Sequence, residues 1–90
     1  MGRLENIDDL IKYNNPAEAL VLLDRIVAEN PADAHALFLR GKAYWRMGQR
    51  SKAMSDYASA ASIDPDSPAV HALEQARDVE SFFNPDLLNP

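Results

Sequence analysis

The chain has no cysteine and only three glycines among its 90 residues. The lack of cysteine excludes disulfides and thiolate chemistry. Three widely separated glycines cannot form the G-x-x-x-x-G-K-[ST] or G-x-G-x-x-G loops that cradle phosphates. The sequence also has no apolar run of signal-peptide or membrane-spanning length. We therefore expect a cytoplasmic protein that does not engage a membrane.

Basic residues are scarce as well. Nine Lys and Arg stand against 14 Asp and Glu, which gives a formal charge of −5 and a sequence pI of about 4.8. A general nucleic-acid binder needs a clustered basic face, so we expect no nucleic-acid partner. Hydrophobic residues make up 47% of the chain, which indicates a globular protein. Its length suits one domain with a modest core.

No set of residues supports catalysis. His35 and His71 are the only histidines, and neither belongs to an H-x-x-x-H or H-E-x-x-H motif. No serine lies in G-x-S-x-G, and the carboxylate pairs are explained by helix ends and solubility. We expect neither an enzyme nor a metal or cofactor site.

Apolar residues recur at helical spacing, and Pro and Gly interrupt them. The pattern predicts five helices, over residues 3–13, 16–29, about 34–47, 50–62 and 68–83. Asn15, Asp33 and Ser67 are expected to cap the second, third and fifth helices, with Glu18 completing a capping box at Asn15. Gly48 is expected to end the third helix in a left-handed conformation.

The stretch around the third and fourth helices has a distinctive pattern, L-x-x-R-G-x-x-Y followed by A-x-x-x-Y and P. The residues are Leu37, Arg40, Gly41, Tyr44, Ala53, Tyr57 and Pro65. A glycine inside a helix needs a reason, because it costs up to about 1 kcal/mol relative to alanine. We expect that Gly41 lets the next helix approach closely, with Ala53 facing it and Tyr57 and Ala60 one and two turns further on.

This pattern resembles the 34-residue tetratricopeptide repeat. Leu37 replaces the usual Trp, Arg40 the usual Leu, and Tyr57 the usual Phe; the Arg40 stem is expected to cover the core while its head reaches solvent or a carboxylate. A shift of 34 residues reveals a weaker copy in Ala19, Leu23 and Pro31, with Ile7 at the glycine position. The C-terminal run also resembles the ends of small stand-alone bacterial proteins of this class.

The resemblance implies an all-α, right-handed superhelix of two helix–turn–helix units plus a capping helix. One domain over 1–85 would comprise repeat one (about 1–33), repeat two (about 34–67) and the capping helix (about 68–83), followed by a short tail, 86–90.

The fifth helix has a polar face where a following helix would require apolar residues, formed by His71, Glu74, Gln75 and Asp78. Its apolar residues Val70, Leu73, Ala76, Val79 and Phe83 lie roughly on one face, as a capping helix requires.

In this family the first helix of each unit lines the concave surface. The resemblance places a groove stripe on the third helix, formed by His35, Phe38, Lys42, Trp45 and Gln49, with Arg46 beside it. Corresponding positions are Leu4, Asp8, Ile11 and Lys12 in the first helix and Ala69, Ala72, Ala76 and Val79 in the fifth. The alternative is that Phe38 and Trp45 only pack against neighbouring helices.

The resulting hypothesis is a non-catalytic scaffold or adaptor that binds an unidentified protein or peptide on its concave face. Lys12, Lys42 and Arg46 favour an acidic or C-terminal ligand segment. Some family members clamp a C-terminal carboxylate, but Leu4, Asp8 and Leu39 occupy those positions here, so the sequence does not support that mode.

The alternative function is a structural subunit of a homo-oligomer, even a weak one, or of a larger assembly. The tail, with Phe82, Phe83, Leu87 and Leu88, either folds back, frays or docks elsewhere.

Overall fold

The structure is a computed structural model that describes the backbone of residues 3–12 and 15–83 and the side chains of residues 7–12 and 15–81. The predicted end of the first helix at Tyr13 lies outside the described residues. So do the side chains of Leu4, Phe82 and Phe83 and the residues Leu87 and Leu88, which the sequence analysis placed in the groove, the capping helix or the tail.

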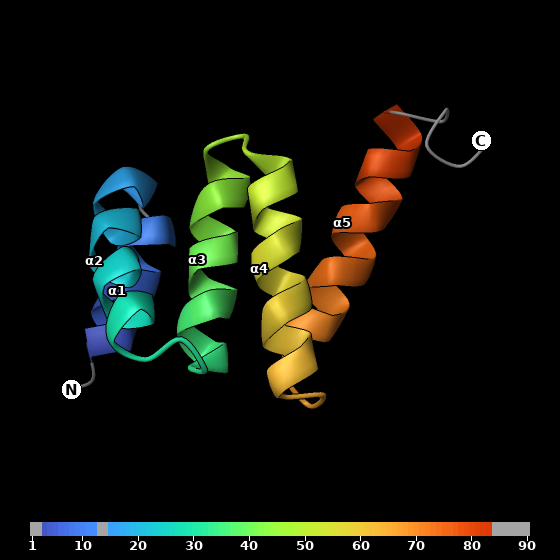
Figure 1. Ribbon diagram of the computed structural model, residues 1–90. Helices are drawn as coiled ribbons and strands as arrows, with labels where there is room; N and C mark the ends of the chain where they lie inside the picture. Colours follow the sequence, from blue (N-terminus) through green and yellow to red (C-terminus); the bar gives the residue numbers. More distant parts are fainter. Residues whose placement is uncertain (1–2, 13–14, 84–90) are drawn as a thin grey trace.

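The described residues form five α-helices and no strand, which confirms the predicted all-α class. They are α1 (Arg3–Lys12), α2 (Pro16–Glu29), α3 (Ala34–Arg46), α4 (Arg50–Ile63) and α5 (Ala69–Phe83). Consecutive helices pack against one another in chain order, and α1 also touches α3 (Figure 1). Compared with the prediction, α3 ends one residue earlier, α4 ends one residue later and α5 begins one residue later.

Two of the three predicted side-chain caps are present. Asp33 Oδ1 accepts from the backbone N–H three residues on at 3.0 Å, and Ser67 Oγ accepts from the N–H two residues on at 3.0 Å. Asn15 is the N-cap residue of α2, as predicted, but its side chain accepts no backbone N–H. Its amide instead donates to the ionised Glu18 carboxylate at 2.5 Å, a charge-assisted hydrogen bond that orients the side chain toward Glu18. Pro16 removes one N–H that would otherwise need a partner.

The turn between α3 and α4 depends on Gly48. Its φ of +79° lies in the left-handed region, where a side chain is disfavoured. The Gly48 N–H donates to the Trp45 carbonyl at 3.0 Å, and the Gln49 N–H donates to the Tyr44 carbonyl at 2.9 Å. This pair of bonds is the Schellman motif, and it satisfies carbonyls at the end of α3 while the chain reverses into α4.

Two hydrophobic clusters form the core. The first joins α1, α2 and α3 and is made by Ile7, Ile11, Ala19, Leu23, Ala36, Leu39 and Ala43. The second joins α3, α4 and α5 and is made by Leu37, Ala53, Tyr57, Ala60, Ala69 and Ala76. Val27 and Phe38 pack against both clusters. Helix α3 therefore lies between the two and contributes a different face to each.

The close approach of α3 and α4 occurs at Gly41. A Cβ atom placed there would lie 2.6 Å from Tyr57 Cε1, 2.7 Å from Tyr57 Cδ1 and 3.2 Å from the Ala53 carbonyl oxygen. Ala53 is fully buried and Tyr57 is 5% exposed, so a new side chain at Gly41 would meet packed atoms of α4 and not solvent. The expected reason for the helical glycine is present in the structure, since the Tyr57 ring occupies the volume of a side chain.

In the first helical pair the same positions hold Ile7 and Leu23, which are both buried in the first cluster. A branched side chain on α1 thus replaces the glycine, and a shorter side chain on α2 replaces the tyrosine. The other positions assigned to repeat packing vary in burial. Ala19, Ala53 and Ala60 are fully buried and Tyr44 is half-buried, while Pro31 and Pro65 are exposed beyond the ends of α2 and α4.

Helix α5 packs on α4 through small residues. Ala69 and Ala76 are buried, and Ala72 and Leu73 pack against the second cluster. Val70 and Val79, which the sequence analysis placed on the packing stripe, are only half-buried. The four polar residues His71, Glu74, Gln75 and Asp78 are all exposed, as predicted. The buried face is therefore centred on alanines, which permit α5 to lie close to α4.

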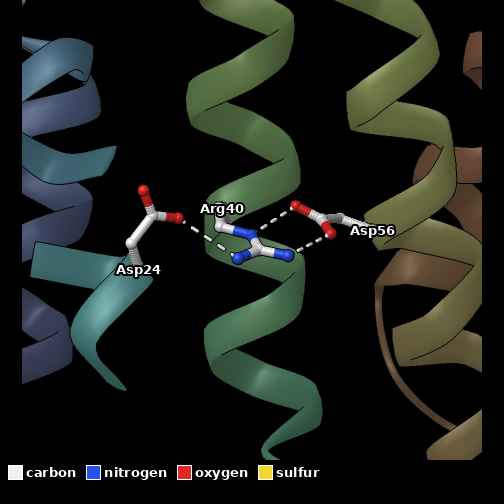
Figure 2. A network of polar contacts seen from close by, with 3 residues as sticks. All are labelled: Asp24, Arg40 and Asp56. Atoms are coloured by element: carbon white, nitrogen blue, oxygen red, sulfur yellow. Dashed lines mark hydrogen bonds and ion pairs between the residues drawn. The ribbon is translucent and has the colours of Figure 1, made fainter. Parts of the chain in front are cut away.

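Arg40 connects three helices (Figure 2). Its Nε and Nη2 donate to the two carboxylate oxygens of Asp56 on α4 at 2.8 and 2.9 Å, and its Nη1 donates to Asp24 on α2 at 3.2 Å. The Asp56 side chain is only 8% exposed, whereas that of Asp24 is 55% exposed. The hydrogen bonds that Arg40 donates to Asp56 raise the pKa of Arg40, so the guanidinium remains charged. Asp56 is thus the main carboxylate that the Arg40 head group reaches.

Gly41→Ala should destabilise the protein by about 1–3 kcal/mol because the new methyl group meets the Tyr57 ring. Helix propensity alone predicts the opposite sign, a gain of about 1 kcal/mol. Urea unfolding measures the difference. In a Tyr57→Leu background, which removes the clashing ring, the same substitution should cost much less. Equal costs in both backgrounds would show that the ring is not the constraint.

Arg40→Leu restores the usual residue of the repeat and should nevertheless cost about 3–5 kcal/mol, because it leaves the Asp56 carboxylate buried without a partner. The double variant Arg40→Leu/Asp56→Ala should recover most of that loss. Asp24→Ala is the matched control. Its exposed pair with Arg40 should contribute no more than about 1 kcal/mol. Urea unfolding of the wild type and the three variants provides the comparison. If the double variant recovers no stability, the prediction is contradicted.

Candidate functional site

A pocket of about 330 Å³ opens among the helices α1, α3, α4 and α5. Its lining is mainly apolar or aromatic, with cationic side chains from α1 and α3. The lining residues are Ile11, Lys12, Phe38, Lys42, Trp45, Arg46, Tyr57, Ala72 and Gln75. A smaller pocket of about 200 Å³ shares Trp45, Tyr57, Ala72 and Gln75 with it and extends along α5 to Ala76 and Val79. We refer to the two together as the groove.

Four of the six groove residues predicted on or beside the third helix line this pocket, namely Phe38, Lys42, Trp45 and Arg46. The other two do not. His35 is exposed in the first turn of α3, and Gln49 lies in the turn before α4. The corresponding positions Ile11 and Lys12 of α1 and Ala72 of α5 also belong to the lining.

Sequence analysis did not assign two of the lining residues to the groove. Tyr57 was assigned only to helix packing, and Gln75 only to the polar face of the last helix. The signal for Tyr57 was its pairing with Gly41, because a ring that packs on a glycine of α3 also lies near the α3 side chains that line the pocket. Gln75 lies 34 residues after Gly41, so it occupies the same repeat position on α5.

Three aromatic rings shape the groove. The Phe38 and Tyr57 ring centroids are 6.0 Å apart with an interplanar angle of 40°, a favourable tilted arrangement. Trp45 is half-buried and packs against the second cluster, and the Arg50 guanidinium lies 5.6 Å from its ring centroid. Both Phe38 and Trp45 therefore pack against neighbouring helices and also line the groove.

The cations on the α1 side of the groove are arranged around Asp8. Lys42 Nζ lies 2.8 Å from Asp8 Oδ1, and Lys12 Nζ lies 3.4 Å from Asp8 Oδ2. Burial alone would raise the pKa of Asp8, but the hydrogen bonds and charges of Lys42 and Lys12 outweigh it and hold the pKa below its usual value. Lys42 Nζ is also 5.4 Å from the centre of the Phe38 ring, a cation–π contact.

The tyrosine hydroxyl in the groove remains protonated near neutral pH. Burial, and to a lesser extent the charge of Asp56, raises the pKa of Tyr57 to about 12. Burial similarly raises the pKa of Tyr44, which lies outside the pocket lining and has the Arg40 guanidinium 5.9 Å from its ring. Tyr57 therefore keeps its proton and does not act as a base in the neutral range.

The site combines an apolar depression, cations at one side and a neutral phenol. Among the described side chains, no group of three or more His, Asp or Glu is placed to hold a metal ion. No helix in the described part of the chain is both long and apolar enough to span a bilayer.

Comparison with known proteins agrees with this architecture. The tetratricopeptide repeat family model matches residues 10–77. The solution NMR structure of the Bacteroides fragilis protein BF1650 is similar, with a TM-score of 0.88 and 34% sequence identity over 99% of this chain and 91% of that chain. No curated protein matches the sequence. On the family match and this structural relative, the chain belongs to the tetratricopeptide repeat family.

Proposed function

We propose that the protein is a non-catalytic interaction module that binds a peptide or protein segment in the groove. Repeat proteins of this kind generally present extended concave surfaces to protein partners, and family membership supports that general function. The observation that carries the proposal is the convergence of Phe38, Lys42, Trp45 and Arg46 on one pocket. Aromatic and Arg side chains in partly desolvated pockets are the usual hot spots of interfaces.

The chemistry of the groove favours a particular ligand. Its volume of about 330 Å³ is at the lower end for small-ligand sites, which suits a few side chains of a segment rather than a large cofactor. The aromatic rings provide an apolar surface for one of those side chains. Lys12, Lys42 and Arg46 place positive charge beside it on a chain of net charge −5. The ligand is therefore an apolar residue flanked by acidic ones.

Self-association is the second candidate. Val21 on α2 is 60% exposed, the highest value among the large hydrophobic side chains of the described residues. Sedimentation at two protein concentrations separates the candidates. A monomer at high concentration removes support for a homo-oligomer, whereas a larger species that disappears in Val21→Ser would identify α2 as the contact surface.

The groove proposal predicts the behaviour of Trp45, the only tryptophan of the chain. The protein is used to capture partners from the native cell lysate. Trp45→Ala should weaken capture of a specific partner by about 30-fold or more, as expected for an interface hot spot worth about 2 kcal/mol. Val21→Ala is the matched control, since it truncates an exposed apolar side chain outside the groove.

Because Trp45 also packs against the second cluster, each variant is first checked by thermal unfolding. The captured partner should also protect the tryptophan of the wild-type protein from acrylamide quenching. Capture that survives in folded Trp45→Ala, with no change in quenching, would place the binding surface elsewhere.

A further inference from the structure

We propose that Asp8 is a built-in competitor of the ligand: its carboxylate occupies the Lys42 ammonium and must be displaced by a carboxylate of the bound segment. This inference rests on the proposed function and specifies how the groove selects its ligand. It assigns to Asp8 a role in specificity, in addition to any role in holding α1 against α3.

The geometry places the Asp8 carboxylate where a ligand carboxylate would bind. Asp8 Oδ1 is 2.8 Å from Lys42 Nζ, and Asp8 Oδ2 is 3.4 Å from Lys12 Nζ. Both lysines line the pocket. A single carboxylate therefore bridges two of the three lining cations that the proposed function requires. Arg46, the third, has interactions of its own.

The contact follows from the repeat. Asp8 and Lys42 are 34 residues apart, so they occupy the same position on α1 and α3, and successive first helices bring equivalent positions together. On α5 that position holds Ala76, which carries no charge. Asp8 of α1 therefore supplies the charge that faces Lys42 at this repeat position.

The partial exposure of the Asp8–Lys42 pair suits exchange of one carboxylate for another rather than a permanent ion pair. The side chains of Asp8 and Lys42 are 30% and 31% exposed, and that of Lys12 is 58% exposed. By contrast Asp56, which Arg40 holds through two parallel hydrogen bonds, is 8% exposed. Partly exposed pairs shift equilibria by only about fivefold or less, so a ligand carboxylate can replace Asp8 at small cost. A ligand without a carboxylate leaves the pair in place.

The test uses two blocked peptides with the full-length protein. The first is acetyl-Glu-Glu-Leu-Leu-Glu-Glu-amide, and the second has glutamine at every glutamate position. Trp45 fluorescence reports binding at low salt. Asp8→Asn should bind the glutamate peptide about two- to fivefold more tightly than the wild type, and should leave the affinity for the glutamine peptide unchanged.

Asp9→Asn is the matched control. It removes the same charge from the adjacent, exposed position of α1 and should leave both affinities close to the wild-type values. A second measurement needs no variant. Saturating wild-type protein with the glutamate peptide should move the NMR signal of the Asp8 carboxyl carbon, while that of Asp9 remains in place.

The possible failures are distinguishable. Equal or weaker binding by folded Asp8→Asn, or an Asp8 carboxyl signal that does not move at saturation, overturns the competitor role while the groove proposal stands. If Asp9→Asn tightens binding of the glutamate peptide by the same factor, the effect comes from net charge alone. That result would also overturn the competitor role. If the glutamate peptide binds no variant, or binds without a change when Lys42→Ala is introduced, the groove proposal and the inference both fail.

Discussion

The close contact between Gly41 and the Tyr57 ring is the constraint on which the second half of the molecule depends. It sets the separation of α3 and α4, because Gly41 contributes no side chain at this level and the Tyr57 ring lies directly against the α3 backbone. It also makes the groove, since the Tyr57 ring that passes Gly41 then meets Phe38 and forms part of the pocket lining. Helix packing and the pocket lining thus both depend on one steric contact, and α3 contributes to each.

Much of this was predictable because short-range sterics determine it. The helical glycine predicted a close approach, and the Gly48 turn and the caps at Asp33 and Ser67 followed from local backbone requirements. At Asn15 the N-cap position was predicted correctly, but the side-chain cap was not formed. Its amide donates to the Glu18 carboxylate, and spacing alone does not determine how that side chain is oriented.

The ion pairs were less accessible to sequence analysis. Arg40 was expected to reach solvent or a carboxylate, but the choice of Asp56 over other acids depends on how α4 is placed against α3. Lys42 and Asp8 were both predicted at groove positions, yet their contact requires the distance between α1 and α3. Long flexible side chains select partners in three dimensions, so a pattern can indicate the surface on which they lie without identifying the partner.

The 34-residue separation of Asp8 and Lys42 has a consequence for how such a chain can grow. At this position the first unit presents an acid to the base of the second unit. A tandem duplication of the second unit would set lysine against lysine, whereas a copy of the first unit placed after the second would restore an acid–base pair. The charge at this position thus favours one order of units over another, by no more than a partly exposed ion pair contributes.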